Sequence, residues 1–488
     1  MTVVIVGAGS AGLSVSRELR LLGVEHVVLE RNRVGQAWRD RWDSFTLVTP
    51  NWTLDLPGSP YAGSDPEGHV PRDEIVSYLE DYGANHAGTI REGISVHSLD
   101  PGRSKRFRLD TSEGPIETDT VVVCSGAYQR PHRPAIAAGF PSDVAVLDST
   151  QYRNPSALPD GKVLIVGSGQ TGVQLAEELR LSGRDVFLSC GRAPWLPRRL
   201  GDKDIVTWLN RTTFFDQPLP GEGARLVANL QTTGARGGHD LHYRVVRDLG
   251  VQLLGRLAAV SNGRVQFAND LADSVAFGDA RYLDIRRLLR DTLGDDVPEM
   301  PDPRPFEAKA AGELDLDGFG AVVFTSGFRP DYGGWVNFPV FDERGFPIVD
   351  DALATAVPGL YFCGVHFLRK RRSSLLFGVG EDAAIVARTI TKALTASPTS
   401  AGDDTADAMQ RVRDCLDKLF RRLRPTRSVR RPVLAHRDAS LRRTDWVAIG
   451  GIADMPGASR TSGCDAIDPK RTSAGSKPRS AASSSLIR

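Results

Sequence analysis

The chain has 488 residues, with 61 Lys and Arg against 60 Asp and Glu. This length allows two or three domains, and the balanced charge argues against nucleic acid as the main partner. No stretch of about 18 apolar residues occurs, so no membrane span is expected, and the nine His and five Cys show no metal-type or C-x-x-C spacing.

The first predicted element is a buried strand at residues 3–6, which leads into a Gly-rich loop and a helix. In the loop Gly7 permits a tight turn, Gly9 lets the backbone approach a pyrophosphate, and Gly12 lets the helix pack on the strand. The helix N-terminus offers N–H groups to phosphates. A second strand ends at Glu30, whose carboxylate can bind ribose hydroxyls, so this site suits FAD or NAD. Because the first strand starts so close to Met1, we expect no signal peptide and a cytoplasmic protein.

An aromatic-rich loop follows, through Phe45, Trp52 and Tyr61. Next come a predicted helix at about 72–82 and predicted strands at 94–99, 105–109 and 120–123. A Ser-Gly turn at Ser125-Gly126 closes this stretch, and prolines at 131–134 mark a linker.

A second strand-loop-helix copy follows at a constant offset, with Gly167, Gly169 and Gly172 in the three glycine positions. Cys190 stands where the first copy has Glu30, and Arg192 follows it. A carboxylate would repel a 2′-phosphate, whereas an arginine would bind it. The second site therefore reads as NADPH-binding, with a solvated surface arginine as the alternative for Arg192.

A long insertion at about 200–250 looks helical and irregular. It either contributes substrate contacts or forms a capping subdomain with its own small core. A hairpin-like stretch at 251–267 follows, and a Val-rich strand at 321–324 ends in Ser326-Gly327, echoing the closure of the first copy.

We therefore predict an α/β fold of two dinucleotide-binding, Rossmann-like domains of the three-layer ββα type, with an inserted helical segment. Residues 1–150 and 328–395 would form the FAD-binding domain, and 151–327 the NADPH-binding domain. An amphipathic helix is expected at 400–425, and a disordered basic tail at 426–488.

Four segments together resemble the class B flavoprotein monooxygenases, and most closely the bacterial flavin-dependent oxidoreductases related to cation-transport flavoproteins. They are the two Gly-rich loops, residues 35–52, the Cys124-Ser125-Gly126 segment with its prolines, and residues 324–332. The resemblance covers about residues 1–395. It implies cofactor-binding roles for Ala11, Arg31, Gln36, Trp38, Arg39, Thr49, Val96, Ser125, Gly126, Gln170, Thr171, Ser326 and Gly327. It also places Asn51 near the flavin as a catalytic candidate, the alternative being a turn-forming Asn after Pro50.

The sequence departs from this family at two positions. Asp148 stands where the family has a His before the second Gly-rich loop, and an aspartate carboxylate cannot donate a hydrogen bond at pH 7. His366 replaces an acidic residue, and we expect it to be a satisfied core histidine.

The resemblance implies an enzyme in which NADPH reduces FAD and a C4a-(hydro)peroxyflavin oxygenates a small organic substrate with O2. Asp148 makes flavin reduction a firmer expectation than oxygen insertion. One alternative is an NADPH oxidase or dehydrogenase that releases H2O2 or passes electrons on. A second is a flavin-binding sensor without turnover. No metal or nucleic acid is expected, and a homodimer is compatible with the sequence.

Overall fold

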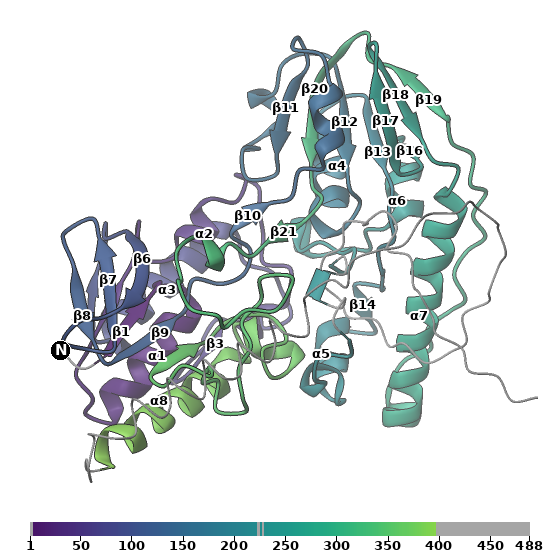
Figure 1. Ribbon diagram of the computed structural model, residues 1–488. Coiled ribbons are helices and arrows are strands. Elements are labelled where there is room, and N and C mark those ends of the chain that lie inside the picture. The colour runs from purple at the N-terminus through teal and green to yellow at the C-terminus, as the bar shows by residue number, and fades with distance from the viewer. Residues whose placement is uncertain (1–2, 222–224, 227–228, 397–488) are drawn as a thin grey trace, which may run out of the picture. The chain divides into compact units, whose positions relative to one another are not determined.

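The computed structural model describes residues 3–221, 225–226 and 229–396 (Figure 1). The helix expected at 400–425 and the tail expected at 426–488 lie outside these residues. Among the helices that the structure describes, none has the length and apolar character to cross a membrane.

The first sheet contains five parallel strands in the order β22-β9-β1-β2-β5. Their bounds are Leu360–Phe362, Thr120–Val123, Val3–Val6, His26–Leu29 and Thr89–Arg91. Helices α1 (Ser10–Leu21) and α8 (Val379–Thr395) pack against each other beside this sheet (Figure 1). Because β22 pairs with β9, the chain returns to the first sheet after it has built the second.

A three-stranded antiparallel sheet forms a further layer of the first unit. It consists of β6 (Val96–Pro101), β7 (Phe107–Thr111) and β8 (Ile116–Thr118). Leu99, Phe107 and Leu109 point from it into the core that the first sheet shares. Short elements complete the unit: α2 (Gln36–Arg39), α3 (Arg72–His86), β3 (Asp55–Leu56) and β4 (Ser59–Pro60).

The second sheet repeats this plan with five parallel strands in the order β11-β20-β12-β13-β16. Their bounds are Ala145–Asp148, Phe319–Phe324, Lys162–Val166, Val186–Ser189 and Gln252–Leu254. Helices α4 (Gln170–Leu181) and α6 (Tyr243–Asp248) belong to this unit. Its own three-stranded sheet consists of β17 (Leu257–Ser261), β18 (Arg264–Phe267) and β19 (Glu313–Asp315).

Alternate residues of the second sheet face opposite layers, as the two-residue period of a strand requires. Val163 and Ile165 of β12 lie in the core that contains Val173 of α4. Leu164 and Val166 lie instead in the core that contains Val265 of β18. Each unit thus has a helix layer, a parallel sheet and a small antiparallel sheet, which confirms the predicted three-layer ββα architecture.

The junction between the units differs slightly from the expected limit at residue 150. Strand β11 already pairs with β20 of the second sheet, so that sheet begins at Ala145. Just before it, β10 (Arg130–Pro131) pairs antiparallel with β21 (Phe328–Arg329). The outgoing and returning stretches of the chain are therefore hydrogen-bonded to each other.

The insertion contributes to a hydrophobic core that is separate from those of the two sheets. It includes β14 (Arg199–Leu200), β15 (Lys203–Asp204), α5 (Ile205–Asn210) and a 3-10 turn at Phe214–Asp216. Trp195, Trp208 and Phe215 lie in its core, and Trp52 and Phe377 from the first unit pack against it. The structure therefore favours the capping-subdomain interpretation of this segment.

Helix α7 (Leu271–Leu293) also lines this core, and the sequence analysis did not predict it. The sequence did indicate this helix, because most of its buried residues recur at intervals of three or four. The buried positions on this helix are Leu271, Ser274, Val275, Gly278, Tyr282, Ile285 and Leu289.

Candidate functional site

The first Gly-rich loop has the geometry of a phosphate cradle. Gly7 has a φ of 105°, and this backbone conformation is strained for any residue that has a side chain. A Cβ on Gly12 would lie 1.9 Å from the Gly7 carbonyl oxygen, whereas a Cβ on Gly9 would meet no described atom within 4 Å. Gly12 is thus needed for packing, while Gly9 leaves open space at the N-terminus of α1, where a pyrophosphate fits.

Glu30 is held against this loop by backbone groups. Ala8 N donates to Glu30 Oε2 at 2.8 Å, and Asn32 N donates to Oε1 at 2.9 Å. The Glu30 carbonyl accepts from Ile94 N, which brings the start of β6 at Val96 close to it. A dinucleotide therefore fits here through its diphosphate and ribose, and the individual contacts of Glu30, Arg31 and Val96 remain predictions.

The second Gly-rich loop has the same backbone turn as the first, but different side chains hold it in place. Gly167 again has a φ of 105°, and a Cβ on Gly172 would lie 2.0 Å from Gly167 O. Ser168 Oγ accepts from Gly191 N at 2.9 Å and lies 2.6 Å from the Tyr243 hydroxyl. A serine and a buried tyrosine thus occupy the position that the Glu30 carboxylate fills in the first copy, and Gly169 begins α4.

Cys190, at the position corresponding to Glu30, is fully buried, and burial raises the pKa of its thiol. Arg192 is exposed beside it. Gln170 Nε2 donates to Leu230 O at 3.1 Å, so the inserted segment runs along the first turn of α4. An exposed arginine for which the described residues show no ion pair suits an extra phosphate, and the roles of Arg192, Gln170 and Thr171 stay predictions.

Two arginines further along, Arg198 and Arg199, do not face this site. Arg198 is buried against Asp204, and Arg199 donates to the Glu67 carbonyl at 2.8 Å. They belong to the contact between the insertion and the 47–70 segment.

The aromatic loop carries the other residues that the resemblance places near the flavin. In α2, Gln36 Nε2 donates to Asp40 at 2.9 Å, and Arg39 pairs with Glu80. The Trp38 ring lies 5.9 Å from Phe45 in a tilted arrangement. These contacts fix α2 in place, and whether its residues touch the flavin stays a prediction.

Asn51 is buried, and its amide orders its own loop. Its Oδ1 accepts from Val70 N at 2.6 Å, and its Nδ2 donates to Asp65 O at 2.9 Å. Thr49 Oγ1 lies 2.6 Å from Thr53 Oγ1 in the same turn. The structure thus gives Asn51 a clear loop-forming role, and a catalytic role remains a separate prediction.

The two Ser-Gly closures lie at the carboxyl ends of β9 and β20. Gly126 and Gly327 have φ values of 67° and 80°. Ser326 Oγ donates to Val166 O at 3.3 Å, and Gln129 Nε2 donates to Ser125 Oγ at 3.0 Å. Each closure therefore lies at the strand ends beside a Gly-rich loop, which is where ligands of open α/β sheets bind.

Asp148, at the family's His position, is paired. Arg133 Nε donates to Asp148 Oδ1, and Arg133 Nη2 lies 3.0 Å from Oδ2. Arg133 belongs to the linker after β10, so this pair joins the linker to the end of β11. The arginine was not predicted, since sequence distance gave no sign that residues 133 and 148 meet.

His366 is a core histidine, as expected. Its Nε2 lies 2.9 Å from Arg225 O, and its ring stacks on Tyr128 with centroids 5.3 Å apart. Burial lowers the pKa of His366 to about 4, so the ring is neutral at pH 7.

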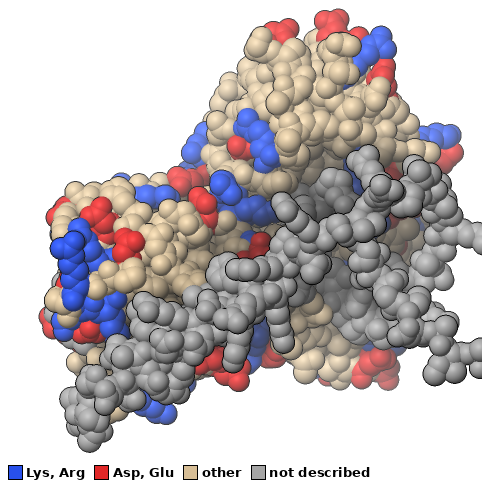
Figure 2. Space-filling view, in the orientation of Figure 1, with Lys and Arg blue, Asp and Glu red and all other residues tan. Residues whose placement is uncertain are grey.

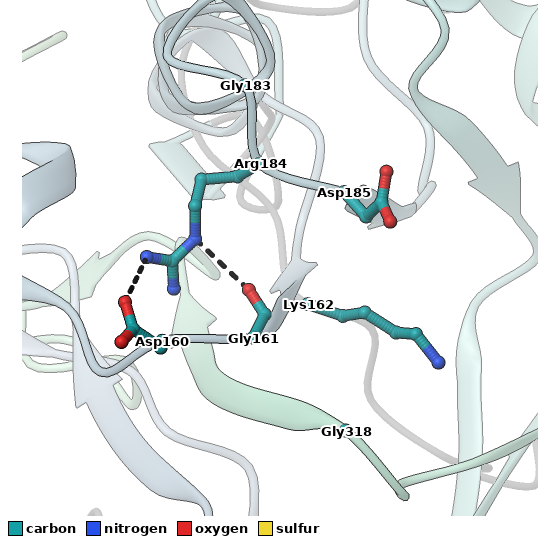
Figure 3. A pocket seen from close by; sticks show the side chains of 7 residues that line it. All are labelled: Asp160, Gly161, Lys162, Gly183, Arg184, Asp185 and Gly318. Atoms are coloured by element: carbon teal, nitrogen blue, oxygen red, sulfur yellow. Dashed lines mark hydrogen bonds and ion pairs between the residues drawn. The ribbon is translucent and has the colours of Figure 1, made fainter.

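A surface cavity of about 400 Å³ lies at the amino ends of β12 and β13 (Figure 3). It is lined by Lys162 and Arg184 together with Asp160 and Asp185. Arg184 Nε donates to Gly161 O at 3.0 Å, so the guanidinium is hydrogen-bonded to a backbone carbonyl. This cavity lies at the opposite end of the strands from Gly167.

On the face shown in Figure 2, acidic and basic side chains are interspersed over the described residues. No large area of one sign is visible on that face outside the grey atoms. The charges on this face therefore give no indication of the substrate.

Comparison with known proteins shows what the chain resembles. Residues 4–214 match the family model for pyridine nucleotide-disulphide oxidoreductase. An uncharacterized CzcO-like oxidoreductase of Geobacillus kaustophilus is 29% identical over 384 residues, which is 78% of this chain and 95% of that protein. The structure of a flavin-containing monooxygenase from Stenotrophomonas maltophilia covers 81% of this chain and 99% of its own, with a TM-score of 0.58 at 21% identity. An indole-3-pyruvate monooxygenase of rice, YUCCA1, is 27% identical over 230 residues, covering 42% of this chain and 56% of its own.

The chain is a class B flavin monooxygenase-like protein. The predicted resemblance is thereby confirmed. The flavin-dependent monooxygenases and oxidoreductases that the chain resembles imply an enzyme with a flavin and a nicotinamide cofactor. The first Gly-rich loop fits such a nucleotide because Gly9 leaves open space at the N-terminus of α1, and the second repeats the same glycine turn.

Proposed function

We propose that the protein is an FAD- and NADPH-dependent monooxygenase that uses O2 to oxygenate a small organic substrate. The observation that carries the proposal is the difference between the two Gly-rich loops. The first is braced by the Glu30 carboxylate, and the second by the Ser168 and Tyr243 hydroxyls with Arg192 exposed nearby. A carboxylate suits the ribose of FAD, and an arginine without a carboxylate suits the 2′-phosphate of NADPH.

The residues of this chain bind and orient the two nucleotides, since the reactivity belongs to the cofactors. A bound flavin would supply hydride acceptance and the activation of O2. Gly7, Gly9 and the α1 N-terminus would hold its diphosphate, and Gly167, Gly169 and the α4 N-terminus would hold that of NADPH. The insertion, which packs Trp52 and Phe377 onto its own core, would exclude water from the reacting atoms.

Anaerobic reduction of the purified holoenzyme tests the first half of this proposal. NADPH should bleach the flavin absorbance, and NADH should do so only at much higher concentration. No bleaching by either nucleotide would contradict the proposed function and favour a flavin-binding sensor.

Admission of O2 to the reduced enzyme tests the second half. A monooxygenase should show a persistent flavin species of shifted absorbance and little H2O2 before substrate is added. Immediate return of oxidised flavin with one H2O2 per NADPH would instead establish an NADPH oxidase.

The oxidase is the second candidate, and one observation favours it. Asp148 replaces the family's His and is neutralised by Arg133, so no imidazole stands at this point beside the second loop. If Asp148→His raises the share of NADPH that is used without H2O2 release, the missing imidazole limits oxygenation in this chain. An unchanged share would show that the Arg133–Asp148 pair is not responsible.

A further inference from the structure

A segment of the insertion, residues 230–233, lies against helix α4, which begins at the second Gly-rich loop. Gln170 Nε2 donates to Leu230 O at 3.1 Å. One turn further along α4, Gln174 Nε2 donates to Thr232 O at 2.8 Å. The two glutamines are four residues apart, so they lie on the same side of the helix. They therefore bind alternate carbonyls of the segment and fix it along the first turns of α4.

Gln231 lies between these two carbonyls in the chain and contacts the loop itself. The residue is 0% exposed, and its Nε2 donates to Ser168 O at 2.7 Å. Its backbone N–H donates to Pro194 O at 2.8 Å, so the main chain of this residue is fixed as well. Because a carbonyl oxygen only accepts hydrogen bonds, the NH2 end of the Gln231 amide has to face Ser168 O.

The bond from Gln231 sets the direction of the peptide between Ser168 and Gly169. No cis peptide occurs among the described residues, and in a trans peptide the N–H points away from the preceding C=O. The Gly169 N–H therefore points away from Gln231. Gly169 is the N-cap of α4, so its N–H is one of the donors that a helix N-terminus offers to an anion.

The preceding peptide of the same loop is held from the sheet. Thr325 Oγ1, at the end of β20, donates to Gly167 O at 2.6 Å. The Ser168 N–H is therefore turned away from Thr325. Both peptides of the turn are thus held by side chains from outside the loop, one from the sheet and one from the insertion.

The first Gly-rich loop is held in another way. There Ala8 N donates to the Glu30 carboxylate, which stands at the end of the neighbouring strand β2. A carboxylate in the second loop would repel the extra phosphate of NADPH. The Gln231 amide carries no charge, so it holds the second loop without that repulsion.

We propose that Gln231 is a positioning residue for the second nucleotide site, where it orients the Ser168–Gly169 peptide so that the Gly169 N–H faces the nucleotide's pyrophosphate. The inference rests on the proposed function, which assigns this loop to NADPH. The pyrophosphate is common to the phosphorylated and unphosphorylated nucleotides. Loss of the Gln231 amide should therefore weaken both, whereas loss of Arg192 should weaken only the one that has a 2′-phosphate.

Equilibrium dialysis of the full-length, FAD-loaded enzyme against NADP⁺ and NAD⁺ tests this role without turnover. Gln231→Met keeps the length of the side chain and removes its amide. The Kd of each nucleotide should rise by the same factor, about 10- to 100-fold, which is the value of one hydrogen bond to a charged group. Unchanged Kd values would overturn the inference. A rise for NADP⁺ alone would place the effect at the 2′-phosphate and would overturn it too.

Gln174→Met is the matched control. It removes the same amide from a bond between α4 and the same segment, but it leaves the bond from Gln231 to Ser168 O in place. Both Kd values should stay near those of the wild type. An equal rise in Gln174→Met would show that the segment acts through packing in general, and the specific role of Gln231 would be wrong.

The flavin absorbance and the thermal unfolding midpoint show whether each variant is folded, since Gln231 is buried. If Gln231→Met does not fold, Gln231→Asn, which is shorter by one methylene group and keeps a polar side chain, should show the same rise in both Kd values, and unchanged values there would overturn the inference. If the wild type binds neither nucleotide, the proposed function fails and this inference fails with it. If the wild type binds and the Gln231 variants bind equally well, only this inference fails.

Discussion

The glycines have the same roles in the two Gly-rich loops, but different side chains contact the two loops. A Cβ added to Gly12 would lie 1.9 Å from the Gly7 carbonyl oxygen, and a Cβ added to Gly172 would lie 2.0 Å from that of Gly167. The turn is therefore the same in both loops. The first loop is then fixed by a charged carboxylate, and the second by two hydroxyls. The backbone thus determines that a dinucleotide fits, whereas the side chain behind the loop determines which one.

The largest effect should come from filling the shared turn. Gly12→Ala and Gly172→Ala each force a methyl group against a backbone carbonyl, an overpacking that costs about 3 kcal/mol, or roughly 100-fold in an equilibrium constant. Gly12→Ala should lose FAD, which is measured by the flavin absorbance that purifies with the protein. Gly172→Ala should keep FAD and lose reduction by NADPH.

Gly312→Ala is the matched control, because a Cβ there meets no described atom within 4 Å. Reduction of Gly172→Ala by NADPH at the wild-type rate would show that the second loop is not the NADPH site.

A second comparison concerns one buried histidine in each unit. Burial lowers the pKa of His366, beside the first sheet, and of His242, before α6, to about 4. Between pH 6.5 and 4 the unfolded chain binds more protons than the folded one, so stability falls as the pH falls through this window. Each histidine contributes a loss on the order of 3 kcal/mol, complete only below about pH 4.

The thermal unfolding midpoint, measured across that pH range, checks this expectation. His242→Phe keeps a ring against Trp195, whose centroid lies 4.3 Å away, and should flatten the acid side of the curve. His97→Gln, at an exposed position, should leave the curve unchanged. Equal curves for wild type and His242→Phe would show that His242 is not the acid-sensitive group.

Removing the carboxylate brace should weaken FAD binding. Glu30→Ala deletes two backbone hydrogen bonds to a charged group, each worth about 1.5–3 kcal/mol, so the Kd of FAD should rise by about 10-fold or more. Equilibrium titration of apoenzyme with FAD measures it. Glu25→Ala, exposed before the same strand, is the control, and an equal loss there would contradict a specific role of Glu30.

The smallest expected effect is the one on the preference for NADPH over NADH. Arg192→Ala should raise the Kd of NADPH about 10-fold and leave that of NADH nearly unchanged, because only the former has a 2′-phosphate. Lys162→Ala, in the cavity at the other end of β12, should change neither value. Equal losses for both nucleotides would mean that the 2′-phosphate lies elsewhere.

The fold was largely predictable because strand-loop-helix patterns are local. Glycine spacing, apolar runs and the echo of residues 121–126 in 321–327 identified both units. The strands that were short or antiparallel, such as β10 and β21, could not be predicted, since only their pairing across nearly 200 residues makes them strands. Helix α7 could have been found from its apolar period, as its buried residues show.

The site was less accessible to sequence reasoning. The second Gly-rich loop was predicted from its glycines alone, and the contact between Ser168 and Tyr243 follows from tertiary packing. The cluster of Arg198, Asp204 and His69 joins residue 69 to residues 198 and 204, so no spacing rule could reveal it. Burial, which a sequence does not report, separates the two arginines: Arg198 is a buried structural cation, and Arg192 is exposed.

The place of β22 and α8 has a consequence for biosynthesis. Both complete the first sheet and pack on α1, yet they are made after the whole second unit. A chain that emerges from the ribosome N-terminus first must therefore build the second sheet while the first sheet still lacks its edge strand β22. Stable flavin loading should follow release of the finished chain, and a nascent chain halted before residue 360 should not retain the cofactor.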